Sequence, residues 1–231
     1  MKRALFLFAI LVLLGHPVGA QEADEATMLE PSSKVPFPVH MTVPGHDMQH
    51  MLTGTGIRTK TFLKVKVYAF GLYVDADAAR PTLSEFAGQT GKDLEKNDGF
   101  YAKLLEMSFP MTLRLVMTRD VGGDDMADAF DGALRPRVQR AAAEMNMPGG
   151  EAALDEFRTF FNVEELTKES ELLFTCADGV LTSAVRGEVK PEVTSPALCW
   201  ALFDVYLGED PISGGGKKNV VQGFPQILGG M

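Results

Sequence analysis

The sequence predicts an α+β fold, in which β-strands come first and helices, a β-hairpin and a last helix follow. Leu63, Val65 and Val67 alternate with lysines, which is the period-2 pattern of a half-buried strand. Between residues 126 and 161 the apolar side chains recur instead at helical spacing. Asp178-Gly179, between two β-rich segments, predicts a hairpin turn. Strands and helices grouped in this way are typical of an α+β protein.

Residues 1–20 have the pattern of a secretory signal peptide. Two basic residues precede an unbroken apolar run at 4–14, and Val18-Gly19-Ala20 ends the segment with small residues. The run is about half of the roughly 20 residues needed to cross a bilayer, and no later segment approaches that length. We therefore expect an exported protein, periplasmic or secreted, with no membrane span once the signal is removed. The competing interpretation is an uncleaved N-terminal anchor.

The charge balance is acidic. Removal of residues 1–20 takes Lys+Arg from 22 to 20 and leaves Asp+Glu at 31, so the net charge moves from -9 to -11. Such a chain is not expected to bind nucleic acid or anionic lipid surfaces. The full chain is 45% hydrophobic, and this is enough for the mature part to bury the core of one large domain.

Residues 21–51 are expected to form an N-terminal linker, because four prolines from Pro31 to Pro44 interrupt an acidic segment. Folding proper should begin near residue 52, with β-structure over residues 54–74. A second pair of strands is expected within residues 104–121, where Leu113, Leu115 and Met117 alternate with more polar residues.

Helices should follow this β-rich part. Asp124 or Asp125 is expected to cap the first helix, which Pro136 breaks or kinks. A second amphipathic helix is expected over residues 154–161, with its phenylalanines in the core rather than around a cofactor.

The C-terminal part contains the clearest local signals. The Asp178-Gly179 turn should join two strands, and Ser195-Pro196 should open a helix that stops at Gly208. Residues 214–231 are glycine-rich and are expected to form a flexible tail.

Two cysteines are present, Cys176 and Cys199. An oxidising compartment would permit a disulfide between them. They could equally be two small buried hydrophobic residues, one in a strand and one on a helix, so the pairing stays open at this point.

A metal site is not expected. His40, His46, Asp47 and His50 lie within eleven positions, but helical signals are absent there and the segment precedes the expected core. We find no phosphate-binding glycine loop and no nucleophile elbow, so the sequence predicts no cofactor.

The ends of the expected domain resemble the chalcone isomerase-like family. The first motif is Gly54-Thr-Gly-Ile-Arg58 followed by Lys66-Val-Tyr68-Ala-Phe-Gly71-Leu-Tyr73. The second is Ser195-Pro-Ala-Leu-Cys-Trp-Ala-Leu-Phe-Asp-Val-Tyr-Leu-Gly208 with the exit Glu-Asp-Pro-Ile-Ser213. The resemblance implies a domain over residues 52–213, with an antiparallel sheet covered on one face by a layer of helices and a ligand cleft between them.

The same resemblance points to two binding residues. Plastid members of the family are fatty-acid-binding proteins in which an arginine and a tyrosine hold the carboxylate, and Arg58 and Tyr68 match these positions. The alternative is that Arg58 is a surface cation. In one continuous strand the two residues would be about 33 Å apart, so a shared site requires the chain to reverse between Thr59 and Leu63.

The isomerase chemistry of the family has no matching residues. Met117 and Met126 fall near the positions of its catalytic lysine and tyrosine, and methionine cannot stabilise a developing oxyanion.

We therefore expect an exported, non-catalytic binding protein for a hydrophobic carboxylic acid such as a fatty acid. The alternatives are an isomerase or intramolecular lyase with a rebuilt site, and an interaction module without a ligand. The sequence leaves the ligand and the oligomeric state open.

Overall fold

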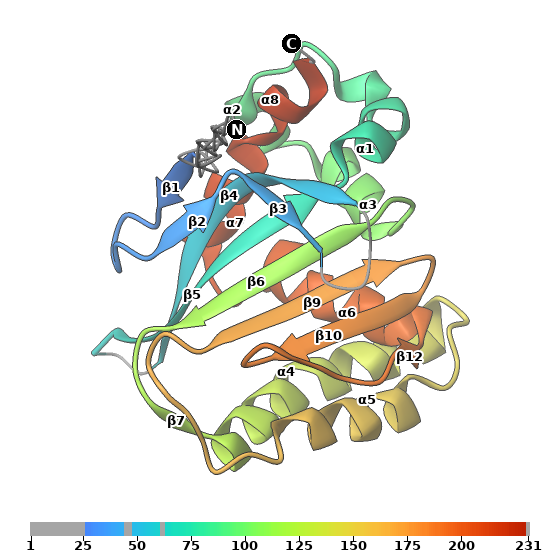
Figure 1. Ribbon diagram of the computed structural model, residues 1–231. Helices are drawn as coiled ribbons and strands as arrows, with labels where there is room; N and C mark the ends of the chain where they lie inside the picture. The colour runs from blue at the N-terminus through green and yellow to red at the C-terminus, as the bar shows by residue number, and fades with distance from the viewer. Residues whose placement is uncertain (1–25, 44–47, 61–62, 230–231) are drawn as a thin grey trace, which may run out of the picture.

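One antiparallel sheet forms the centre of the protein (Figure 1). The computed structural model describes residues 26–43, 48–60 and 63–229, so the expected signal peptide lies outside the described residues. The strands of the sheet follow the order β11-β10-β9-β6-β5-β4-β3, and β12 pairs with β10. β1 pairs with β2, and β7 with β8, in two separate antiparallel pairs.

The described strands are β1 Thr27–Leu29, β2 Pro36–Pro38, β3 His40–Thr42, β4 Gln49–Lys60, β5 Val65–Val74, β6 Met111–Met117, β7 Val121–Gly122, β8 Glu165–Leu166, β9 Glu171–Ala177, β10 Val180–Val185, β11 Glu188–Val189 and β12 Val193–Thr194. The helices are α1 Ala76–Thr82, α2 Gly91–Leu94, α3 Asp98–Leu105, α4 Gly123–Glu144, α5 Gly150–Arg158, α6 Pro196–Leu207, α7 Gly214–Gln222 and α8 Phe224–Gly229, with 3-10 turns η1 Ser84–Phe86 and η2 Thr159–Phe161.

The helices form a layer on one face of the sheet. Figure 1 shows α6 and α7 behind the strands, with α4 and α5 alongside α6. This arrangement confirms the expected α+β fold with an antiparallel sheet and a one-sided helical layer. In the part of the chain that the structure describes, no helix is both long and apolar enough to cross a bilayer.

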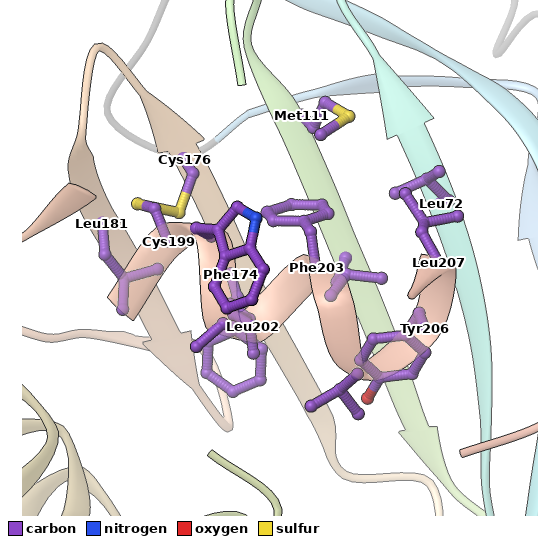
Figure 2. Close-up of a cluster of buried hydrophobic side chains, with 14 of the residues drawn as sticks. Leu72, Met111, Phe174, Cys176, Leu181, Cys199, Leu202, Phe203, Tyr206 and Leu207 are labelled. Carbon is purple, nitrogen blue, oxygen red and sulfur yellow. A yellow bond between two sulfur atoms is a disulfide. The ribbon is translucent and has the colours of Figure 1, made fainter. Parts of the chain in front are cut away.

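Helix α6 is the centre of the helical layer. As expected, Ser195 caps it by accepting a hydrogen bond from the Leu198 amide at 3.1 Å, and Pro196 occupies its first position. Every residue from 197 to 207 is buried, so α6 is enclosed by sheet and helices on all sides. Figure 2 shows its side chains, among them Leu202 and Phe203, against the strands.

A disulfide joins the sheet to this helix. Cys176 of β9 and Cys199 of α6 are bonded, with their Cα atoms 5.8 Å apart, and both residues are buried (Figure 2). The sequence left two alternatives open, a disulfide or two separate buried cysteines, and the structure has the disulfide.

The local signals of the C-terminal half are confirmed. Asp178 and Gly179 have φ angles of 51° and 76°, as a two-residue hairpin turn between β9 and β10 requires. The expected phenylalanine cluster lies in the core: the Phe130 and Phe161 rings stack at 5.1 Å, and Phe157 contacts Phe174 edge-on at 5.3 Å.

The expected linker at residues 21–51 is wrong for the part of it that is described. β3 is an edge strand of the main sheet, and β4 already begins at Gln49. Phe37, between two prolines, is fully buried on the outer face of the sheet, where the Arg114 guanidinium lies 5.0 Å from its ring. Prolines are tolerated in short edge strands, so the prolines of this segment are compatible with strands such as β2 and do not indicate a linker.

The expected flexible tail at residues 214–231 is also wrong. Residues 214–229 form α7 and α8, and Val220, Val221, Phe224 and Ile227 are buried. A glycine of β4 allows α7 to pack closely on the sheet. A Cβ at Gly54 would lie 2.4 Å from the carbonyl oxygen of Asn219, so α7 can lie against β4 only because Gly54 has no side chain.

Two further expectations need correction. Residues 98–105 form a helix, so of the strand pair expected at 104–121 only β6 belongs to the main sheet. Gly122, not Asp124 or Asp125, is the N-cap of α4, and this helix continues through Pro136.

We predict that Gly54→Ala destabilises the protein by about 1–3 kcal/mol, because the added methyl group would overlap the backbone of α7. Thermal and denaturant unfolding measure the change. Gly214→Ala is the matched control, since a Cβ there meets no atom within 4 Å. Equal stability of the two variants would contradict close packing of α7 on β4.

Candidate functional site

A cleft of about 670 Å³ opens between the sheet and the helical layer. Its walls are the β4–β5 hairpin, residues 119–122, one face of α4, the last part of α6 and residues 210–212. The volume lies within the range of about 300–1,000 Å³ that is typical of small-molecule sites.

Arg58 and Tyr68 lie opposite each other on the two strands of the hairpin. Their Cα atoms are register partners, so both side chains leave the same face of the sheet, and both line the cleft. β4 ends at Lys60 and β5 begins at Val65, so the chain reverses between these residues. The expectation that a reversal brings Arg58 and Tyr68 together is confirmed.

Arg58 is held in place without a counter-ion. Its Nη1 group donates a hydrogen bond to the Ile212 carbonyl at 3.2 Å, and the guanidinium forms no ion pair with any residue of the described ranges. A guanidinium has five N–H donors, so most of its donors remain to meet a ligand. A carboxylate is the group that such a planar donor set binds best.

Tyr68 forms part of a buried hydroxyl pair. Its hydroxyl lies 3.1 Å from that of Tyr206, and both residues are buried. Burial raises the pKa of Tyr68, while the hydrogen bond with Tyr206 and the charge of Arg58 lower it by less. Burial also raises the pKa of Tyr206 well above its usual value. Both phenols are therefore neutral at physiological pH, and Tyr68 can donate a hydrogen bond to an anion while it accepts a hydrogen bond from Tyr206.

The sequence analysis missed Tyr206 as a site residue. In the sequence it stood only within the second family motif, from Ser195 to Gly208. The signal that could have found it is a tyrosine in a helix whose residues are apolar on nearly all sides. Such a helix is buried, and a buried phenol needs a hydrogen-bond partner.

A second arginine in the cleft wall has a structural role. Arg137 of α4 donates to Asp204 at 2.8 Å and to the Asp210 carbonyl at 2.7 Å, and Arg140 also contacts Asp204 at 3.0 Å. These bonds compensate the buried Asp204 carboxylate. They also tie residues 208–212 to α4, which places the Ile212 carbonyl beside Arg58.

Apart from charged side chains that include Arg119, Asp120 and Asp125, the rest of the cleft has an apolar wall. Phe130, Val205 and the small residues Ala129, Gly132 and Ala133 line it. A Cβ at Gly132 would meet no atom within 4 Å, so this side of α4 leaves open space.

Of the two methionines considered in place of catalytic residues, Met126 lines the cleft. Met117 is fully buried in the core. Neither side chain offers a donor for a reacting oxyanion.

The remaining candidates do not reach the cleft walls. His50 is buried in the sheet, with Nδ1 3.0 Å from the Thr112 hydroxyl, and His40 lies on edge strand β3. His46 and Asp47 fall outside the described residues. Elsewhere in the described chain, no three metal-binding side chains come close enough to hold an ion.

Comparison with known proteins agrees with this architecture. A family model described as "Chalcone isomerase like" matches residues 48–221. The chain belongs to the chalcone isomerase-like family. Its solved relatives include a fatty-acid-binding protein of Arabidopsis thaliana, which superposes with a TM-score of 0.75 at 23% identity over 89% of this chain and 100% of that chain. That likeness concerns the fold.

Two sequence relatives of this chalcone isomerase-like chain illustrate the spread of the family. "Fatty-acid-binding protein 1" of Arabidopsis thaliana is 26% identical over 210 residues, which cover 88% of this chain and 72% of that protein. A chalcone–flavanone isomerase of Oryza sativa subsp. japonica is 27% identical over 206 residues, 84% of this chain and 88% of the enzyme. Identity alone therefore does not separate a binding role from an enzymatic one.

We predict that the buried hydroxyl pair makes stability depend on alkaline pH. The folded protein holds the protons of Tyr68 and Tyr206 more tightly than the unfolded chain does, so their contribution is complete below about pH 10 and decreases as the pH rises further. Denaturant unfolding of the wild type and of Tyr68→Phe/Tyr206→Phe, from about pH 8 to about pH 11, measures this. The variant should lose less stability over this range. An equal loss in both proteins would contradict neutral buried phenols.

Proposed function

We propose that this protein binds a hydrophobic carboxylic acid, such as a long-chain fatty acid, in the cleft and does not catalyse a reaction on it. The observation that carries the proposal is the Arg58 guanidinium, which forms no ion pair with any described residue and lies beside the neutral Tyr68–Tyr206 pair. A carboxylate there would receive a charge-assisted hydrogen bond from Arg58 and a second one from Tyr68. The names of the Arabidopsis relatives support a ligand of this kind.

The hydrocarbon part of the ligand would lie along the apolar wall that α4 and Val205 form. Arg137 does not compete for the carboxylate, because Asp204 and two backbone carbonyls already engage its guanidinium. The cleft therefore offers one anion-binding end and one apolar region, which matches an amphipathic acid with a single head group.

We further propose that the protein is exported to the periplasm or secreted. The signal-peptide pattern of residues 1–20 supports export, and the disulfide between Cys176 and Cys199 is compatible with an oxidising compartment.

A second candidate function is an isomerase or intramolecular lyase, favoured by the similarity to the rice enzyme. Methionine at positions 117 and 126 argues against it, since neither residue can polarise a ketone. Arg58 and Tyr68 would then act on a phenolic substrate instead of a fatty acid. An interaction module without a ligand is the third candidate, and the calorimetric experiment below separates it from the first.

We predict that Arg58→Ala weakens binding of C12 to C18 fatty acids by roughly tenfold to a hundredfold, because a hydrogen bond to a charged group is worth about 1.5–3 kcal/mol. Tyr68→Phe should cost less, about 0.5–1.5 kcal/mol. Calorimetric titration measures both changes, and thermal melts confirm that the variants fold.

Arg119→Ala is the matched control, because it removes an exposed cation of the same cleft. It should have little effect. No binding by the wild type would rule out the carrier function, and an equal loss in both arginine variants would remove Arg58 from its assigned role. Turnover of a chalcone well above the spontaneous rate would favour the isomerase instead.

We also predict that Ala133→Phe weakens binding while it leaves the carboxylate site intact, since the ring would fill the space that the small residues of α4 leave open. Displacing about three methylenes of the ligand costs about 2.4 kcal/mol at about 0.8 kcal/mol each. The loss should grow with chain length across the C12 to C18 series. Ala142→Phe, at an exposed position of the same helix, is the control and should bind like the wild type. A loss that is independent of chain length would place the hydrocarbon elsewhere.

A further inference from the structure

The β4–β5 hairpin carries positive charge in an acidic protein. Residues 48–74 contain Arg58, Lys60, Lys64 and Lys66 but no aspartate or glutamate, whereas the whole chain has a net charge of -9. The acidic total argued against contact with anionic lipid, but the excess of negative charge is carried outside this segment. A local cluster, not the net charge, decides what a surface attracts at distances below about 10 Å.

The same hairpin exposes apolar side chains next to its lysines. Leu63 is 70% exposed and Val65 is 36% exposed, and the flanking Lys60, Lys64 and Lys66 are exposed as well. Lys60 and Lys64 form no ion pair with any residue that the structure describes, and the Lys66 ammonium group donates only to the Ser32 carbonyl. One exposed leucine is ordinary. Exposed aliphatic side chains among uncompensated lysines are instead typical of segments that bind an anionic membrane surface.

The position of this surface connects it with the cleft. Lys60 and Val65 line the cleft and are also exposed, so they lie at its rim. Arg58 and Tyr68 belong to the same two strands, and Figure 1 shows the hairpin projecting at the lower left of the sheet. A membrane that contacted the tip of the hairpin would therefore meet the opening through which a ligand reaches Arg58.

We propose that Lys60 and residues 63–66 dock the protein on an anionic lipid bilayer, with the rim of the cleft against the membrane. The lysines attract the lipid head groups, and Leu63 enters the interfacial region. A fatty acid can then pass between bilayer and cleft without crossing bulk water, where its hydrocarbon chain is poorly soluble. The transfer of a fatty acid rests on the proposed function, but binding to the membrane can be tested separately.

The test is cosedimentation of the full chain with vesicles of phosphatidylcholine that contain about one third phosphatidylglycerol. Wild-type protein should bind these vesicles at low salt, bind vesicles of pure phosphatidylcholine much less, and dissociate as salt is added. Lys64→Glu/Lys66→Glu should bind at least about tenfold more weakly, because the tip then repels the head groups. Leu63→Ser should reduce binding by a smaller factor.

The matched control is Lys92→Glu/Lys96→Glu. It changes the net charge by the same amount, on exposed lysines in and next to α2, which Figure 1 shows at the opposite end of the molecule. It should bind vesicles like the wild type. Failure of the wild type to bind anionic vesicles, equal binding to neutral vesicles, or an equal loss in the control variant would each overturn the proposal.

Fatty-acid titration without vesicles keeps the two proposals apart. None of Leu63, Lys64 and Lys66 lines the cleft, so their variants should bind the fatty acid like the wild type. Vesicle binding with no fatty-acid binding would preserve the docking surface and reject the carrier. Fatty-acid binding with no vesicle binding would preserve the carrier and reject the docking surface.

Discussion

The register between β4 and β5 determines the whole polar end of the cleft. Arg58 and Tyr68 are direct partners across the two strands, so a slip of one residue would send one of them to the opposite face of the sheet. Gly54 and Gly56 precede Arg58 on the same face of β4, and they admit the backbone of α7. The segment that leads into α7 then brings the Ile212 carbonyl to Arg58. One strand thus supplies both the cation of the proposed site and the packing surface that orients it.

The charges around the cleft are divided between a structural and a free arginine. Arg137 and Arg140 compensate the buried Asp204, and this network is satisfied within the protein. Arg58 donates to a neutral carbonyl and forms no ion pair with any residue that the structure describes. Two arginines on one aspartate leave this network with one net positive charge, and Arg58 adds a further cation. Positive charge at this end of the cleft is what the proposed carboxylate ligand requires.

Much of this architecture could be predicted from local signals. The Asp178-Gly179 turn and the Ser195-Pro196 helix start are determined by neighbouring residues, and the structure has them as expected. The alternation before Val67 was misleading, because Leu63 precedes β5 and is 70% exposed, and Val65 is exposed as well. The pairing of Arg58 with Tyr68 followed from the family resemblance and the reach of an extended strand. Tyr206, Ile212 and α7 could not be found in this way, because their roles depend on contacts with residues far away in the sequence. Glycines in residues 214–216 suggested a flexible tail, whereas Gly216 permits a close approach of α7 to Gly56 and Phe70.

The two contacts that complete the site join distant parts of the chain. The Arg58–Ile212 bond spans 154 residues, and the Tyr68–Tyr206 bond spans 138. Contacts between residues so far apart in the sequence tend to form late in folding. The chain between them must lose its conformational entropy before the contact can stabilise the fold. A nascent chain that has formed only the hairpin therefore presents an arginine and a tyrosine but no enclosed site. A ligand that occupied the cleft would therefore bind only the finished native state, and it would stabilise that state against reopening.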